Sequence, residues 1–279
     1  MARYDVSTWD EFVTAWKTVD GNDSIEVNAD LDVNDNIPDS TINMVNHAVA
    51  GPVTINGNGH TVYNVSGGGG TFFSNDYHAT TINKLNFQNI NLTTPLCRGD
   101  GYEKQLYFND CNIQGRDTAL FFTGYTNFNR CTLTLTNTRS QITPDTNNYV
   151  YFRYCWIYLR NCKKTWNGGD TPLIRHAYTC YIKGEIDMTG ISNTNIVSGI
   201  NNSCINVTVT GVTATNLPLT RYVYDSSGLL TIVNTSKLNT DTTASDESLI
   251  KGVTDAQMKD AEYLAELGFD IVPSSEWGE

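Results

Sequence analysis

Carboxylates and histidines are the side chains of this chain that could perform hydrolytic or lyase chemistry. A glycoside hydrolase needs two or three carboxylates that converge on one face, and a lyase needs a base beside a cation or a calcium site. The acidic candidates are Asp110, Asp117, Glu185, Asp187 and Asp225, and the histidines are His47, His60, His78 and His176. The acids are scattered over separate segments, and no two aspartates are adjacent. We therefore predict no catalytic residues, with a polysaccharide-degrading enzyme as the alternative.

Aromatic residues crowd the middle of the chain and offer binding chemistry instead. Tyr154, Trp156 and Tyr158 alternate with apolar residues, and Arg160 lies close by. Side chains two residues apart share one face of a strand, so this group is expected to point outward. An outward patch of aromatic and arginine side chains suits a subunit interface or a saccharide surface. Of the two, we favour the interface.

Asp110, Arg130 and Tyr154 occupy the same place in successive copies of a repeated segment. A row of this kind could form a functional face. A solvated ion pair between Asp110 and Arg130 is the simpler expectation, and exposed pairs typically contribute under about 1 kcal/mol.

The elements that must position these residues are revealed by cysteines that recur at nearly constant intervals. The repeated cysteines are Cys111, Cys131, Cys155, Cys180 and Cys204. Around each one, apolar and polar residues alternate with a period of two, which is typical of a β-strand. A repeat of about 20 to 25 residues built on short strands is typical of a solenoid. We predict an all-β parallel β-helix with the five cysteines stacked as a ladder inside it.

Metal binding and disulfides are not expected of these cysteines. The chain has seven cysteines, an odd number, and Cys97 and Cys162 lie outside the repeat. No Cys-x-x-Cys motif or Cys/His cluster is present. Stacked thiols in an apolar core behave as small hydrophobic groups. The sequence predicts neither a metal nor a cofactor.

Both ends of the chain carry helical patterns. Residues 7–16 place Trp9, Phe12, Val13 and Trp16 on one face, with Ser7 as the expected N-cap. This helix is expected to cover the open end of the first coil. A second helix is expected from Asp255 to Leu267, with Thr254 as its N-cap and Gly268 as its terminator.

Three regions follow from these patterns: a capping helix in residues 1–23, the β-helix in residues 24–234, and a polar linker with a helix in residues 235–279. The linker has little to bury, so the terminal helix needs a partner on which to pack. The apolar residues expected to dock it are Leu264, Leu267, Phe269 and Trp277.

Composition limits the partners and the compartment. The net charge is −12 and the basic residues are scattered, which argues against nucleic acid as a partner. No run of apolar residues is long enough to cross a membrane, so no membrane span is expected. The first residues lack the pattern of a secretion signal, so synthesis and folding are expected in the cytoplasm.

Two segments resemble known families. Val53–Val62 (VTINGNGHTV), with the STWDEF opening of the first helix, resembles the first coils of the right-handed parallel β-helix superfamily typified by pectate lyases. Val253–Leu264 (VTDAQMKDAEYL) is similar to termini of bacteriophage virion proteins. Together these resemblances imply a right-handed β-helix in a phage structural protein, and such proteins are commonly homotrimers.

We therefore expect a non-enzymatic virion protein that decorates a capsid or forms part of a tail or baseplate. It would be assembled in the bacterial cytoplasm and contact other virion proteins through its C-terminal segment or the flank of the rod. The alternatives are a tailspike depolymerase and a carbohydrate-binding receptor-recognition protein, whose partner would be a host surface glycan.

Overall fold

A computed structural model describes most of the chain. The described residues are 1–33, 52–64, 66–67, 73–75, 80–92, 97–99, 105–116, 122–124, 126–137, 150–163, 174–189, 197–201, 203–211, 231–234 and 250–268.

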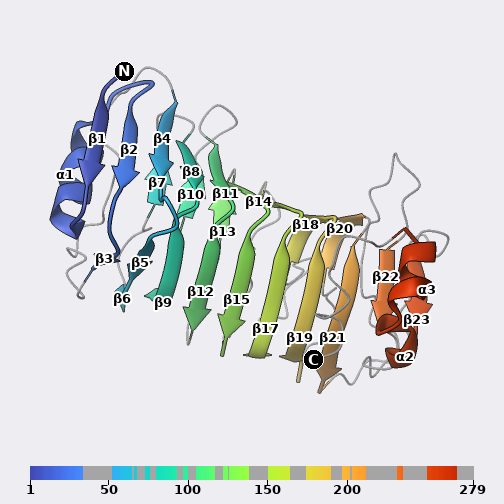
Figure 1. Cartoon of the computed structure of the whole chain (residues 1–279). Helices are drawn as coiled ribbons and strands as arrows, with labels where there is room; N and C mark the ends of the chain where they lie inside the picture. Colours follow the sequence, from blue (N-terminus) through green and yellow to red (C-terminus); the bar gives the residue numbers. More distant parts are fainter. Residues whose placement is uncertain are drawn as a thin grey trace.

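Three sheets run along the molecule, and Figure 1 shows their strands side by side from the N-terminal to the C-terminal end. The nine-stranded sheet has the order β1 (Arg3–Val6), β2 (Ser24–Val27), β4 (Val53–Asn56), β8 (Thr80–Asn83), β11 (Leu106–Asn109), β14 (Thr126–Asn129), β16 (Val150–Arg153), β18 (Ile174–Tyr178) and β20 (Val197–Asn201). The eleven-stranded sheet has the order β3 (Leu31–Asp32), β5 (Thr61–Tyr63), β9 (Asn86–Leu92), β12 (Asn112–Arg116), β15 (Thr132–Thr136), β17 (Trp156–Lys163), β19 (Tyr181–Asp187), β21 (Cys204–Thr210), β22 (Thr231–Asn234) and β23 (Ile250–Val253), with β6 (Ser66–Gly67) paired to β9 off this path. The three-stranded sheet has the order β7 (Phe73–Asn75), β10 (Cys97–Gly99) and β13 (Phe122–Gly124).

The described strands pair in parallel, and each lies beside the strand one coil further along the chain. Parallel neighbours separated by a whole repeat are the arrangement of a solenoid, in which each coil contacts the next. The predicted all-β parallel β-helix is therefore confirmed.

The core is built from columns of identical side chains. Phe108, Phe128 and Phe152 stack with ring centroids 5.0 and 5.1 Å apart. Beside them the thiols of Cys131 and Cys155 donate to the carbonyl oxygens of Phe108 and Phe128, at 3.3 and 3.4 Å. Each thiol thus ties its coil to the preceding one. Burial raises the pKa of the Cys155 thiol well above its usual value.

The cysteine ladder ends earlier than predicted. Cys180 occupies the fourth rung and donates to the Phe152 carbonyl oxygen at 3.4 Å. The fifth rung is Ser203, whose hydroxyl donates to the Ala177 carbonyl oxygen at 3.3 Å. Cys204 is the next residue and faces the other side of its strand, so the prediction that it belongs to the ladder is wrong. All five predicted cysteines are buried, and none forms a disulfide.

A sharp bend precedes each of the four cysteine rungs, and a fifth bend of the same kind precedes Leu85 one coil earlier. The bend residues Lys84, Asp110, Arg130, Tyr154 and Thr179 have φ angles between 50° and 55°, in the left-handed region. The bends also stack, because the Asp110 and Arg130 amides donate to the carbonyl oxygens of Asn129 and Arg153, each at 3.0 Å. The side chain of a bend residue points out of the coil, so the backbone carries the geometry and the side chain can vary.

Helix α1 (Trp9–Thr18) covers the N-terminal end of the core, as predicted (Figure 1). Trp9, Phe12 and Trp16 are buried against the first coil. The N-cap is Thr8 rather than Ser7, because Thr8 and Glu11 form a reciprocal capping box. Strand β1 precedes this helix and pairs with β2, so the solenoid begins within the region predicted to be a cap alone.

The C-terminal end forms a second apolar cluster on the outer face of the eleven-stranded sheet. Strand β23 pairs with β22, so the sheet extends beyond the predicted boundary at residue 234. Two short helices follow, α2 (Asp255–Met258) and α3 (Ala261–Glu266). Thr254 caps the first, as predicted, but the single predicted helix is divided because Asp260 caps the second. The predicted linker, residues 235–248, lies outside the described residues.

Candidate functional site

The outer face of the nine-stranded sheet carries two columns of side chains, one on each side of the phenylalanine column. Alternate residues of a strand point to opposite faces, so Tyr107 and Asn109 flank the buried Phe108 and both point outward. The same alternation recurs in the strands paired with β11. Each column is therefore a row of side chains, one from each coil.

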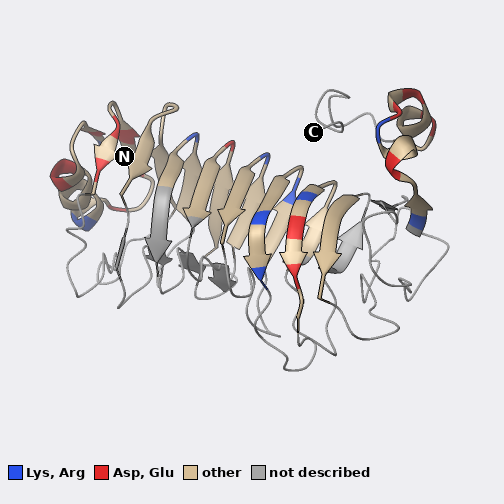
Figure 2. Ribbon diagram, turned by 90° about the horizontal axis from the view of Figure 1, so that it is seen from below, with Lys and Arg blue, Asp and Glu red and all other residues tan. Residues whose placement is uncertain are grey.

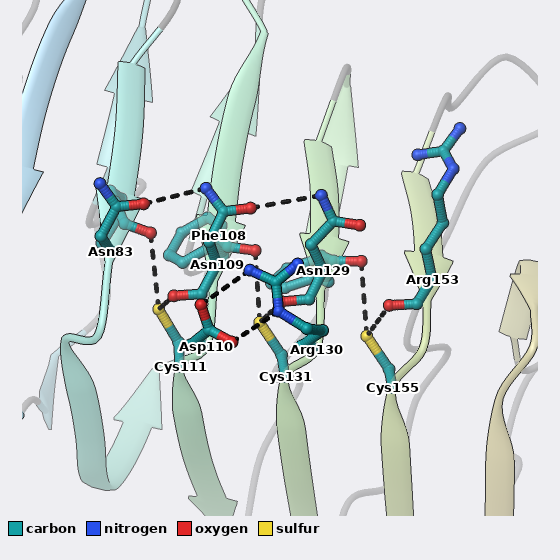
Figure 3. Close-up of polar contacts among 12 residues, drawn as sticks. Asn83, Phe108, Asn109, Asp110, Cys111, Asn129, Arg130, Cys131, Arg153 and Cys155 are labelled. Carbon is teal, nitrogen blue, oxygen red and sulfur yellow. Dashed lines mark hydrogen bonds and ion pairs between the residues drawn. The ribbon is translucent and has the colours of Figure 1, made fainter. Parts of the chain in front are cut away.

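Over the first half of the sheet, one column is a ladder of asparagine amides. Asn56 donates to Glu26 Oε1 at 2.7 Å and Asn83 donates to Asn56 Oδ1 at 3.1 Å. Asn109 then donates to Asn83 at 3.0 Å, and Asn129 donates to Asn109 at 3.3 Å (Figure 3). We call this set the amide ladder. Successive asparagine amides are thus hydrogen-bonded to one another from coil to coil.

Beyond Asn129 the same column changes character. Arg153 pairs in register with Asn129, and Tyr178 pairs with Arg153. The guanidinium carbon of Arg153 lies 5.0 Å from the ring centroid of Tyr151 and 5.7 Å from that of Tyr178. Its Nη1 donates to Asn127 Oδ1 at 3.0 Å. Cation–π contacts and a hydrogen bond therefore hold the arginine against the sheet.

The neighbouring column extends this group in both directions. Asn127 Nδ2 and the Tyr107 hydroxyl both donate to Gln105 Oε1 at 2.9 Å. On the other side, the rings of Tyr151 and His176 stack with centroids 4.8 Å apart. We call the whole set the aromatic face: Gln105, Tyr107, Asn127, Tyr151, Arg153, His176 and Tyr178.

The aromatic face combines flat rings with amide and guanidinium groups. Asn127 is buried and its other members are half-buried, so the rings are fixed by packing while part of each surface is accessible. A flat ring accepts the CH face of a pyranose, and amide and guanidinium groups match its hydroxyls. None of the seven side chains is a carboxylate. The surface therefore presents ring faces and hydrogen-bonding groups that a ligand can contact.

Three of the five predicted acids are described, namely Asp110 at a bend and Glu185 and Asp187 on β19, and none of the three belongs to the aromatic face. Asp110 receives two hydrogen bonds from Arg130, from Nε at 2.7 Å and from Nη2 at 2.8 Å, which confirms the predicted ion pair (Figure 3). These hydrogen bonds hold the pKa of Asp110 below its usual value. Asp117 and Asp225 lie outside the described residues.

Asp187 and Glu185 both lie on β19. Asp187 Oδ1 accepts from the hydroxyl and the amide of Thr189, at 2.6 and 2.8 Å, and Lys163 Nζ lies 3.1 Å from Oδ2. These contacts, the Thr189 hydrogen bonds first, lower the pKa of Asp187 to about 2. Glu185 is exposed. The contacts of Asp187 fasten a corner of the coil.

Two of the four histidines are described. His60 Nδ1 lies 3.3 Å from Asp30 Oδ1 at a turn between β4 and β5. His176 belongs to the aromatic face. His47 and His78 lie outside the described residues.

The predicted aromatic stripe is divided between two environments. Tyr154 sits at a bend and is 57% exposed, and Arg160 on β17 is exposed as well. Trp156 and Tyr158 do point outward, but they pack against the C-terminal apolar cluster of the same chain. The expectation that a neighbouring subunit covers these two rings is therefore corrected, because the chain itself covers part of them.

The predicted docking residues are also used within the chain. Leu264 is buried in the C-terminal cluster and Leu267 packs against it, so both pack on the rod of the same chain, while docking on another protein stays a prediction. Met258 joins them, with its sulfur 3.5 Å from Sγ of Cys204. Phe269 and Trp277 lie outside the described residues. The rod itself is the partner that orders this segment.

Sequence reasoning missed Arg153, His176 and Tyr178 as one group. A signal for part of it was present, because Tyr151 precedes Phe152 as Tyr107 precedes Phe108. Once the phenylalanines are placed inside, both tyrosines must point outward. Tyr151 and His176 lie on neighbouring coils, so their contact follows from the register between β16 and β18 and not from either strand alone.

The described residues contain no group of three or more histidine, cysteine, aspartate or glutamate side chains able to hold a metal ion. Nor does any helix among them have the length and apolar character needed to cross a membrane.

The chain is similar to a known protein family and to a solved structure. Residues 3–142 match the family described as "Putative pectate lyase-like adhesive domain". No curated protein matches the chain. A solved structure described as a "putative immunoglobulin A1 protease" from Bacteroides ovatus is similar, with 15% identity and a TM-score of 0.45 over 95% of this chain and 87% of that one.

Proposed function

The chain belongs to the pectate lyase-like adhesive domain family, and from this premise we propose that it is a non-catalytic adhesive β-helix that binds a saccharide through its aromatic face. The observation that carries the proposal is Arg153, whose guanidinium contacts the rings of both Tyr151 and Tyr178 and is hydrogen-bonded to Asn127. A cation fixed by half-buried rings is preorganised, so little side-chain freedom is lost on binding. Sugars are recognised by such combinations of ring faces and polar groups.

The state of the described carboxylates supports binding over catalysis. Hydrolysis of a glycosidic bond requires two carboxyl groups on either side of that bond. Asp110 is engaged by Arg130, and Asp187 by Thr189 and Lys163. Both are held in the charged form, which is unsuited to a general acid.

The test begins with a glycan array probed with the labelled protein, followed by titration of each bound glycan in solution. Replacing Arg153 or Tyr178 with alanine is expected to weaken binding at least tenfold. Tyr154→Ala is the matched control, because Tyr154 is an exposed tyrosine that lies outside the aromatic face.

Three outcomes would overturn this proposal. The native protein could bind no glycan on the array. Tyr154→Ala or Trp156→Ala could remove binding while Arg153→Ala keeps it, which would place the site on the predicted stripe instead. Bound glycans could be shortened during incubation, as measured by reducing ends or unsaturated products, which would show an enzyme.

The place of the protein in a virion stays a prediction, supported by the resemblance of Val253–Leu264 to phage virion termini. The homotrimer also stays a prediction that rests on this resemblance. Capsid and tail genes beside the coding gene would support the virion role. Light scattering of the purified protein measures the oligomeric state, and a monomer would contradict the trimer.

A further inference from the structure

The nine-stranded sheet has an open edge at its N-terminal end. Among the described residues, β1 pairs with β2 on one side and with no strand on the other. The carbonyl oxygens of Ala2 and Val6 accept from the amides of Ser24 and Asn28, so these alternate residues direct their backbone groups toward β2. In a parallel ladder the intervening residues direct theirs away. The backbone groups of Arg3 and Asp5 therefore face the open edge.

Helix α1 lies beside this edge and leaves a groove of about 550 Å³. The groove is lined by Tyr4, Asp5, Val6, Asp10, Glu11, Thr14, Ala15 and Thr18. Its helical wall is a stripe of residues three or four apart, which lie on one face. The burial of Trp9, Phe12 and Trp16 fixes that helix to the core. Both walls of the groove are thus held in place by the fold.

The rim of the groove is acidic. Asp5, Asp10 and Glu11 lie along it, and Figure 2 shows acidic residues gathered on α1 and β1. Arg3 offsets Asp5, with its Nη2 2.9 Å from Asp5 Oδ1. The carboxylate of Glu11 accepts from the Ser7 amide at 2.8 Å, which fixes its position. The whole chain carries a net charge of −12, so a second copy is a poor electrostatic match for this rim and a basic segment is a good one.

We propose that this groove binds an extended, lysine- or arginine-containing segment of a partner protein, which adds to β1 as a further strand of the nine-stranded sheet. The backbone of the segment would pair with the outward amides and carbonyls of Arg3 and Asp5, as in other cases of strand addition. Its basic side chains would lie near Asp10 and Glu11. This site is separate from the aromatic face and does not depend on saccharide binding.

The test uses a short labelled peptide that alternates lysine with valine or threonine, titrated into the full chain by fluorescence anisotropy. Asp10→Lys is expected to weaken binding at least tenfold. Glu262→Lys is the matched control, because Glu262 is also an exposed acid at the second position of a helix and the change in charge is the same. Arg153→Ala should leave peptide binding unchanged.

A second arm separates strand addition from simple charge attraction. The same peptide with every backbone amide methylated keeps its charge but has no amide hydrogen left to donate to β1 on either edge. We expect it to bind at least tenfold more weakly. Equal binding of the methylated peptide, or equal weakening by Glu262→Lys, would overturn the proposal. Self-association that Asp10→Lys abolishes, seen by light scattering, would replace the partner with a second copy.

Discussion

The amide ladder and the aromatic face occupy the same outer surface of one sheet, yet they use it in opposite ways. From β4 to β14 the column holds Asn56, Asn83, Asn109 and Asn129, whose amides bond to one another. From β16 onward it holds Arg153 and Tyr178. Both halves belong to one continuous parallel sheet, and the side chains of this column differ between them.

The comparison suggests that the amide ladder serves the stability of the rod and the aromatic face serves recognition. An amide that bonds to the coils on both sides uses one N–H and one lone pair to connect those coils. A half-buried ring or guanidinium presents, in addition to its contacts within the fold, a surface that a ligand can cover. We expect changes in the amide ladder to alter stability, and changes in the aromatic face to alter binding.

The largest expected effect concerns the core that both halves share. Cys155→Asp places a carboxyl group in an apolar column at a fully buried position and should lower the free energy of unfolding by several kcal/mol, about 3 or more. Cys155→Ser is the control and should cost far less, because Ser203 already forms the equivalent hydrogen bond. Urea denaturation followed by circular dichroism measures both. A native midpoint for Cys155→Asp would show that the column is not a closed core.

An intermediate effect is expected from the amide ladder. Asn109→Ala removes the hydrogen bonds to Asn83 and Asn129 and should lower the free energy of unfolding by about 1–2 kcal/mol, with saccharide affinity unchanged. Arg153→Ala should show the reverse pattern. Denaturation and glycan titration of the two variants provide the measurement. If Asn109→Ala weakened binding as much as Arg153→Ala, the two halves would be one site.

The smallest expected effect is at the bend beside the ladder, where Arg130 holds the pKa of Asp110 below its usual value. The ion pair therefore stabilises the fold above the unfolded pKa of aspartate, about 4, and this contribution is lost as the pH falls through the lower, folded pKa. Both side chains are exposed, so the gain is under about 1 kcal/mol. Thermal unfolding should show Asp110→Asn slightly less stable than the native protein at pH 6, with a smaller difference at pH 3. A difference of equal size at both values would assign it to something other than charge.

The sequence was sufficient to predict the coil but not the place where its period changes. Phe152 pairs with Ala177, and Ala177 pairs with Ile200, so the second step along the chain is shorter than the first. The rung after Cys180 is therefore Ser203, and Cys204 falls on the opposite face. A slip by a single position reverses every side chain of a strand, and regular cysteine spacing conceals it.

The binding surface was only partly predictable for a related reason. Alternation shows that Trp156 and Tyr158 point outward, and they do. It does not show what covers them, because the cluster that packs there depends on contacts such as that of Cys204 with Met258, which lies far along the chain. The aromatic face likewise depends on register across coils, which a single strand does not contain.

The row of left-handed bends gives this rod a property of its own. Lys84, Asp110, Arg130, Tyr154 and Thr179 adopt one backbone conformation with five unrelated side chains. Any of them is exchangeable at little cost to the coil, since none is required by the turn. Equivalent bend positions therefore recur once per coil, about 4.8 Å apart. Labels, charges or reactive groups introduced at these positions would lie in a line with one group on each coil. Natural substitutions at the same positions can change the surface while the fold of the coil stays the same.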